Sequence, residues 1–150
     1  MTPEFEKTVI INSNPANVWN TLTDLKLMRK WMGETEMEIE IQTDWEINNP
    51  IIINGFHHVK FENKGVVLQF EPNRIVSYTH LNSLSRLEDR LGNYSIITFV
   101  LRPVQDQTSL TLTIDNFPTE TIFKHLCFYW RTTLEKIKIS AEKQAELLNS

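Results

Sequence analysis

Residues 118–141 read PTETIFKHLCFYWRTTLEKIKISA, and this pattern predicts one long amphipathic helix. Thr119 can cap the helix, and Glu120 suits its first turn, where the helix dipole favours a negative charge. Apolar residues recur every three or four positions, so they form a single stripe over about five turns. The stripe consists of Phe123, Leu126, Cys127, Trp130, Leu134, Ile137 and Ala141. Such a helix needs a second apolar surface to pack against.

The residues before this helix supply that surface as strands. Apolar and polar residues alternate in most of them, which is typical of a strand with one buried face and one wet face. Residues 63–65, 71–73 and 102–108 are expected turns, and residues 82–93 are the longest expected loop. We expect strands over residues 6–11, 36–41, 45–47, 51–53, 57–62, 66–70, 75–81, 94–101 and 109–114.

Two short helices are expected between the first strand and the others. Asn14 is a good N-cap residue, and Pro15 fits the first helical position. Asp24 begins a second helical segment, and Gly33 can end it. The apolar side of this second segment consists of Leu25, Met28, Trp31 and Met32.

The order of elements defines the fold class. Hairpin connections between alternating strands imply an antiparallel sheet with one face on the core. We predict an α+β fold in which a curled antiparallel sheet of six or seven strands surrounds the long C-terminal helix, as a single domain over residues 1–150. A cavity between the sheet and this helix is the expected place for a ligand.

Composition excludes several classes of function. The chain has 150 residues and a formal net charge of −4. This negative net charge disfavours non-specific nucleic-acid binding, which needs a basic surface. Cys127 is the single cysteine, so an internal disulfide and a zinc site built on several thiolates are excluded. We see no membrane-spanning run and no secretory signal, and therefore expect a cytoplasmic protein.

Three motifs, taken in order, resemble those of a known family. The first joins a proline, a valine–tryptophan pair, threonine–aspartate and an aromatic residue after a basic one. The second places two glycines in strands that end in a proline turn, and the third runs from a proline through a threonine-rich strand to a phenylalanine and a helical tryptophan. The matching residues are Pro15, Val18, Trp19, Thr23, Asp24, Lys30, Trp31, Gly55, Gly65, Pro72, Arg74, Ile75, Val76, Pro103, Thr108, Leu110, Leu112, Phe117 and Trp130.

These motifs resemble the START and polyketide-cyclase-like (SRPBCC) superfamily. Within it, the sequence is similar to the AHSA-like family, named after the C-terminal domain of the activator of the heat-shock chaperone ATPase. The resemblance spans residues 5–143 and implies the helix-grip fold. It also implies a small lipophilic ligand, a cyclase or hydrolase-like activity, or a chaperone-cofactor role in the stress response, since one fold hosts many activities. Ile114 stands where members often carry a histidine.

Catalytic and metal chemistry have little support. Glu36, Glu38 and Glu40 share one face of a predicted strand, which is typical of a solvated surface. Cys127 falls on the apolar stripe of the last helix, where a buried thiol acts as a small hydrophobe. No phosphate-binding glycine loop and no glycine-flanked serine occur. We predict no cofactor, no metal site and no catalytic residues, so an enzyme is the less favoured interpretation.

The histidines are candidates for polar contacts in the cavity. His57 shares a strand face with apolar residues that we assign inward, whereas His58 points to the other face. The two therefore cannot bind one metal ion from a strand. His80 follows Tyr78 by two residues, so these two could line one face, and His125 has no obvious partner.

Aromatic residues are the strongest functional signal. Small-molecule sites have mostly apolar walls and a few polar groups. The leading hypothesis is a site for a small lipophilic molecule, in a monomer or homodimer. The alternatives are a module that interacts with a chaperone ATPase through an outward patch, or an enzyme that uses His57 with Tyr78. The predicted ligand-binding residues are Trp31, Trp45, His57, Phe61, Phe70, Tyr78, Phe99, Ile114, Phe123, Cys127 and Trp130.

Overall fold

The structure is a computed structural model and describes residues 4–148. Its strands form one antiparallel seven-stranded sheet in the order β1-β7-β6-β5-β4-β3-β2, which confirms the predicted α+β fold. The elements are β1 (Phe5–Ile11), α1 (Pro15–Thr23), α2 (Leu25–Met32), η1 (Thr35–Met37), β2 (Glu40–Gln42), β3 (Pro50–His57), β4 (Val59–Glu71), β5 (Ile75–Asn82), η2 (Ser83–Ser85), η3 (Leu91–Asn93), β6 (Ser95–Val104), β7 (Gln107–Asp115) and α3 (Glu120–Leu148).

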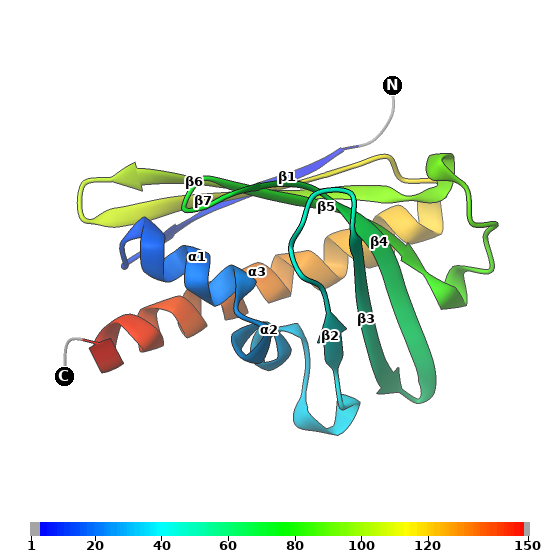
Figure 1. Ribbon diagram of the computed structural model, residues 1–150, viewed down its shortest axis with the longest axis horizontal. Coiled ribbons are helices and arrows are strands. Elements are labelled where there is room, and N and C mark those ends of the chain that lie inside the picture. Colours follow the sequence, from blue (N-terminus) through cyan, green and yellow to red (C-terminus); the bar gives the residue numbers. More distant parts are fainter. Residues whose placement is uncertain (1–3, 149–150) are drawn as a thin grey trace.

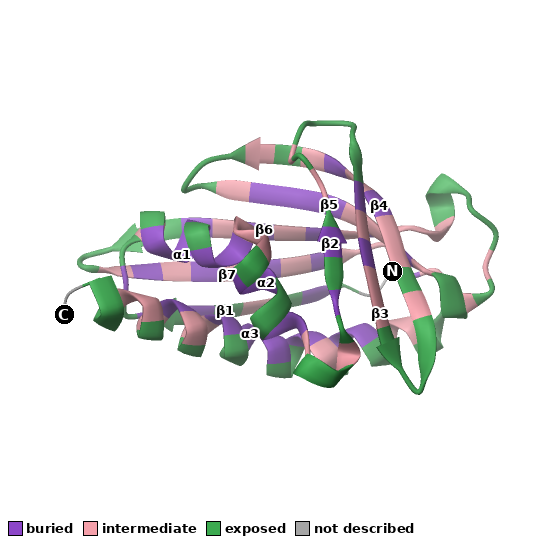
Figure 2. Cartoon of the chain, turned by 60° about the horizontal axis from the view of Figure 1, so that its bottom comes forward, coloured by how far each residue is buried: buried purple, intermediate pink, exposed green. Residues whose placement is uncertain are grey.

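All three α-helices lie on one side of the sheet (Figure 1). β1 and β5–β7 run along the length of α3, whereas β2–β4 turn away from them, so the sheet curls around the helix. Buried residues gather on the sides of α3 and the strands that face each other (Figure 2). We call the side of the sheet that faces α3 its inner face. This arrangement places the core between one helix and a curved sheet.

The two short helices begin where their capping residues predict. The Asn14 side chain accepts a hydrogen bond from the backbone N–H of Asn17 at 2.8 Å, and Pro15 is the first residue of α1. The Asp24 carboxylate accepts two backbone N–H groups of the first turn of α2, at 2.9 and 3.1 Å. Gly33 follows the last residue of α2. These starts depend on local hydrogen bonds, which a sequence pattern reveals directly.

Helix α3 confirms the predicted amphipathic stripe and is longer than expected. The Thr119 hydroxyl accepts the backbone N–H of Ile122 at 3.1 Å, which caps the helix at the expected residue. The helix then continues for 29 residues. Its buried side consists of Leu126, Cys127, Trp130, Thr133, Leu134, Ile137 and Ala141.

The strands predicted over residues 36–41 and 45–47 are largely wrong. Thr35–Met37 form the short helix η1, and Glu38 has a left-handed backbone with a φ of 47°. Strand pairing begins only at Glu40, and residues 45–47 lie in a loop. Alternating acidic and apolar residues fit a strand, but a strand also needs a neighbour to pair with, and that neighbour is set by the tertiary fold.

The hairpin turn predicted at residues 63–65 is misplaced. The chain turns between β3 and β4 at His58, which has a φ of 66°. Gly65 lies inside β4, and a Cβ atom there would overlap the backbone carbonyl of Thr79 in β5. The glycine therefore permits two strands to approach closely, rather than forming a turn. The register of these strands also shifts at a bulge two residues later.

Hydrogen bonds tie α3 to the two short helices. The Asn17 side-chain amide donates to the Ala141 carbonyl at 2.8 Å and to the Ser13 hydroxyl at 2.7 Å. The Tyr129 hydroxyl donates to the Met32 carbonyl at the end of α2, also at 2.7 Å. These bonds hold the helices as one layer against the sheet. No helix within residues 4–148 has the length and apolar character needed to cross a membrane.

Candidate functional site

A first aromatic cluster on the inner face contains three of the predicted ligand-binding residues. The Trp45 ring lies 5.3 Å from the Phe70 ring and 6.4 Å from the Tyr78 ring, between centroids. Trp45 comes from the loop between β2 and β3, has a φ of 59°, and donates from Nε1 to the Thr23 carbonyl at 3.0 Å. A positive φ is uncommon for a bulky residue, so contacts with the cluster hold this loop in place. Trp19 of α1 packs on Phe70 at 5.1 Å between ring centroids.

A second aromatic cluster joins β6 to the helices. The Trp130 ring lies 6.2 Å from the Trp31 ring and 5.7 Å from the Phe99 ring. All three residues are buried. The Trp31 Nε1 group donates to the Thr21 carbonyl at 2.8 Å, which satisfies its one polar atom. This second aromatic cluster fills the space between β6, α2 and α3.

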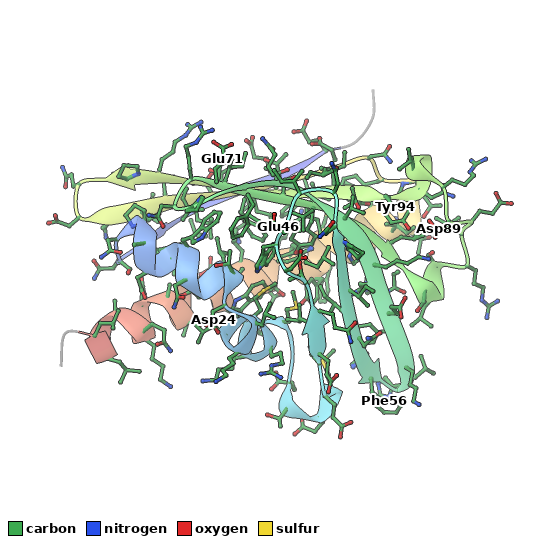
Figure 3. All side chains as sticks on the ribbon, in the orientation of Figure 1. Asp24, Glu46, Phe56, Glu71, Asp89 and Tyr94 are labelled. Atoms are coloured by element: carbon green, nitrogen blue, oxygen red, sulfur yellow. The ribbon has the colours of Figure 1, made fainter. Side chains whose placement is uncertain are left out.

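The other predicted ligand-binding residues have no ring contact with these two clusters. Ile114 and Cys127 are buried in the core, and Phe123 packs against Phe117 at 4.8 Å. Phe61 is half-buried on β4. His57 shares the strand face of Phe61, as predicted, but it is exposed, so its expected inward burial is wrong. The hairpin extends past the core, as the labelled neighbour Phe56 at its tip shows (Figure 3).

The Tyr78 hydroxyl is the most unusual polar group of the inner face. The residue is 3% exposed, and within residues 4–148 its hydroxyl makes no hydrogen bond. Every fully enclosed side-chain nitrogen or oxygen in the described chain has a partner. The Tyr78 oxygen is therefore not fully enclosed, and it must reach a small space that a water molecule can touch. Burial, and secondarily Tyr129, raises the pKa of this hydroxyl far above its usual value.

Two titratable side chains of α3 act on β5: the half-buried Tyr129 on Tyr78, and the exposed His125 on His80. His80 is two residues further along the inner face of β5, and its pKa is lowered to about 4, first by burial and then by His125. The Tyr129 hydroxyl donates to the Met32 carbonyl, and burial raises its pKa to about 12. We call Tyr78, His80, His125 and Tyr129 the β5–α3 polar cluster.

The sequence predicted only part of this polar cluster. It paired Tyr78 with His57, which is exposed, and it found no partner for His125. The structure instead brings His125 within electrostatic range of His80. The available signal was the four-residue spacing of His125 and Tyr129, which places both on one side of a helix. Nothing in the sequence says that this side approaches β5, since that contact joins residues far apart in the chain.

Two hollows on the surface are small. The larger has a volume of about 260 Å³ and lies between α2 and α3, beside Trp31, Lys136 and Ile139. The other has about 160 Å³ and lies under the loop after β5, beside Lys64 and Asp89. Typical small-molecule pockets have about 300–1,000 Å³. Neither hollow is lined by Tyr78, so neither provides the expected cavity.

The described residues form neither an activated cysteine nucleophile nor a metal-binding cluster. Burial raises the pKa of the Cys127 thiol, with Arg131 as a smaller opposing cause, so the reactive thiolate is disfavoured. No three His, Cys, Asp or Glu side chains in residues 4–148 come together as metal ligands. The rings of His57 and His58 lie 4.6 Å apart, but they form only a pair on the exposed hairpin.

Solved bacterial structures share this fold. A protein of Cytophaga hutchinsonii has a TM-score of 0.78 and 26% identity, over 97% of this chain and 98% of its own. One of Chromobacterium violaceum has a TM-score of 0.77 and 16% identity, over 93% and 97%. The Aha1 dimer of Colwellia psychrerythraea has a TM-score of 0.72 and 19% identity, over 93% and 96%.

Sequence comparison adds the family. No curated protein matches the chain significantly. The family described as "Activator of Hsp90 ATPase homolog 1-like protein" matches residues 12–142, which is most of the chain and includes every element from α1 to β7. This agrees with the resemblance carried by the three sequence motifs. The chain belongs to the Activator of Hsp90 ATPase homolog 1-like family of the SRPBCC superfamily.

Proposed function

We propose that this protein binds a small, mainly apolar molecule between α3 and the inner face of β4–β6. The observation that carries the proposal is Tyr78, a buried residue beside the Trp45 ring whose hydroxyl has no hydrogen-bond partner in residues 4–148. Because this hydroxyl has no partner within residues 4–148, its donor is available to a ligand. A ligand that accepts from it would gain a hydrogen bond, and the aromatic walls would supply the apolar contact.

The proposed site needs side chains at its margin to move. Trp45 and Phe61 are half-buried, so they can move at lower cost than the fully buried members of the wall. Trp45 also belongs to a loop with an uncommon backbone conformation. The proposal treats residues 1–150 as one cytoplasmic ligand-binding domain, either monomeric or homodimeric.

Native mass spectrometry tests this function. The full chain is purified gently from its own cells, and its native mass is compared with its denatured mass. We expect a reproducible mass excess that disappears on denaturation, and the same spectra report monomer or dimer. His80→Phe should reduce the excess because it alters the polar cluster, whereas His58→Phe makes the same change on the exposed hairpin and should preserve it. A clean apo mass in all three proteins would contradict tight ligand binding.

A second candidate function is interaction with a chaperone ATPase. The family description and the similarity to an Aha1 dimer support it. Phe128 gives it a specific surface, because this aromatic side chain on the outer side of α3 is 77% exposed. We expect Phe128→Ser to weaken binding to an Hsp90-type ATPase in a purified pull-down, and Thr132→Ser, one turn further along the helix, to leave it unchanged. Equal binding by Phe128→Ser would exclude this surface.

A further inference from the structure

The buried side chains of residues 4–148 include no carboxylate, lysine or arginine. The buried polar residues of the described chain are all neutral: Ser13, Asn17, Thr21, Ser77, Ser95, Thr108 and Thr133. The titratable groups that act on Tyr78 and His80 are Tyr129 and His125, and neither is a carboxylate, a lysine or an arginine. A charged ligand group placed here would therefore lose its water without gaining an opposite charge.

Within the β5–α3 polar cluster, Tyr78 and His80 are also uncharged at neutral pH. The pKa of His80 is about 4, so its ring is neutral at pH 7 and offers one donor and one acceptor nitrogen. Tyr78 keeps its proton because its pKa is raised. The Tyr129 hydroxyl is occupied, since it donates to the Met32 carbonyl at 2.7 Å. The free groups that remain are one hydroxyl donor and one neutral imidazole.

We infer that the ligand of this site is an uncharged molecule with an apolar body and one hydrogen-bond acceptor, such as a ketone, ester or ether oxygen, which accepts from the Tyr78 hydroxyl. Carboxylates and protonated amines are disfavoured at the same position. This inference rests on the proposed ligand-binding function and narrows it to one chemical class. The Tyr78 hydroxyl supplies the donor for this acceptor, and the nearby rings of Trp45 and Phe70 supply an apolar surface that suits the body of the molecule.

Three probes with the same naphthalene body test the inference: naphthalene, 2-acetylnaphthalene and 2-naphthoate, of which the last two are nearly equal in shape. Each is titrated at pH 7 into the full chain, and dissociation constants are taken from NMR chemical shifts. We expect the ketone to bind about tenfold more tightly than naphthalene, which is the value of about one good hydrogen bond. We expect the carboxylate to bind at least about tenfold more weakly than the ketone.

Two matched variants assign the effect to Tyr78. Tyr78→Phe removes only the unpartnered hydroxyl, and it should bring the affinity for the ketone down to that for naphthalene. Tyr94→Phe makes the same change on the outer surface, where the Tyr94 hydroxyl donates to Asp89 at 2.5 Å, and it should keep the wild-type preference. The labelled Tyr94 and Asp89 lie beside each other (Figure 3).

The outcomes separate this inference from the function on which it rests. If naphthalene binds, but the carboxylate binds as tightly as the ketone or Tyr78→Phe retains the ketone preference, the neutral-acceptor inference is wrong and ligand binding stands. If none of the three probes binds, both the proposed ligand-binding site and the neutral-acceptor inference are wrong. Wild-type preference for the ketone, lost only in Tyr78→Phe, supports both.

Discussion

Gly65 shows how one residue sets the distance between two strands. A Cβ atom at this position would overlap the backbone carbonyl of Thr79, and backbone atoms cannot move aside as a flexible side chain can. We expect Gly65→Ala to lower the free energy of unfolding by about 3 kcal/mol or more, measured by urea denaturation. Gly92→Ala is the control, because no atom lies within 4 Å of its added Cβ, and it should change stability by less than about 0.5 kcal/mol. Equal stability of both variants would show that β4 and β5 can separate freely.

His80 should make stability depend on pH. Its pKa in the folded chain is about 4, below the ordinary value of 6.5, because of burial and of His125 on α3. The unfolded chain therefore binds the proton first as the pH falls, and the free energy of unfolding decreases between about pH 7 and pH 4. Because the ring is partly exposed, we expect a loss of about 1–2 kcal/mol from pH 7 to pH 5.

Chemical denaturation at several pH values measures this effect. His80→Gln cannot take up the proton and should lose less stability than the wild type over the same range. Carboxylates also titrate at low pH, so the difference between the two proteins, rather than either curve alone, reports His80. His58→Gln on the exposed hairpin should behave as the wild type does. Parallel curves for the wild type and His80→Gln would contradict burial of this ring.

Helix α1 depends on α3 as well as on its own cap. The Asn17 side chain donates to the Ala141 carbonyl and the Ser13 hydroxyl, and both bonds are buried. Asn17→Ala should therefore lower the free energy of unfolding by about 2 kcal/mol, because two buried hydrogen bonds are lost. Asn20→Ala changes an exposed residue of the same helix and should cost less than about 0.5 kcal/mol. A similar small effect for both would mean that the contact between α1 and α3 does not need this amide.

Helices and strands differed in how well the sequence predicted them. The starts of α1, α2 and α3 agree with the capping residues Asn14, Asp24 and Thr119. These bonds span two or three residues, so they are visible in a short window of sequence. The start of strand pairing at Glu40 and the turn at His58 depend on partners elsewhere in the chain, and alternation alone does not identify a partner.

Ligand binding should stabilise the whole domain, because a ligand that binds only the folded state shifts the unfolding equilibrium. At ten times its dissociation constant, 2-acetylnaphthalene should add about 1.4 kcal/mol. For a domain of this size, we expect the Tm to rise by about 3–6 °C in a thermal scan. 2-Naphthoate at the same concentration should give a much smaller rise. No shift with the ketone at saturation would contradict binding to the folded state.

The local sequence pattern and the tertiary structure therefore determine different features of this protein. Amphipathic periodicity and capping residues specify the long helix, the two short helices and an antiparallel sheet, because these patterns repeat within a few residues along the chain. Ordered motifs along the chain also identify the family. By contrast, the exposure of His57, the close approach at Gly65 and the meeting of Tyr78 and His80 with Tyr129 and His125 depend on how the sheet curls over α3. Those contacts join residues more than ten positions apart, and only packing in three dimensions brings such residues together.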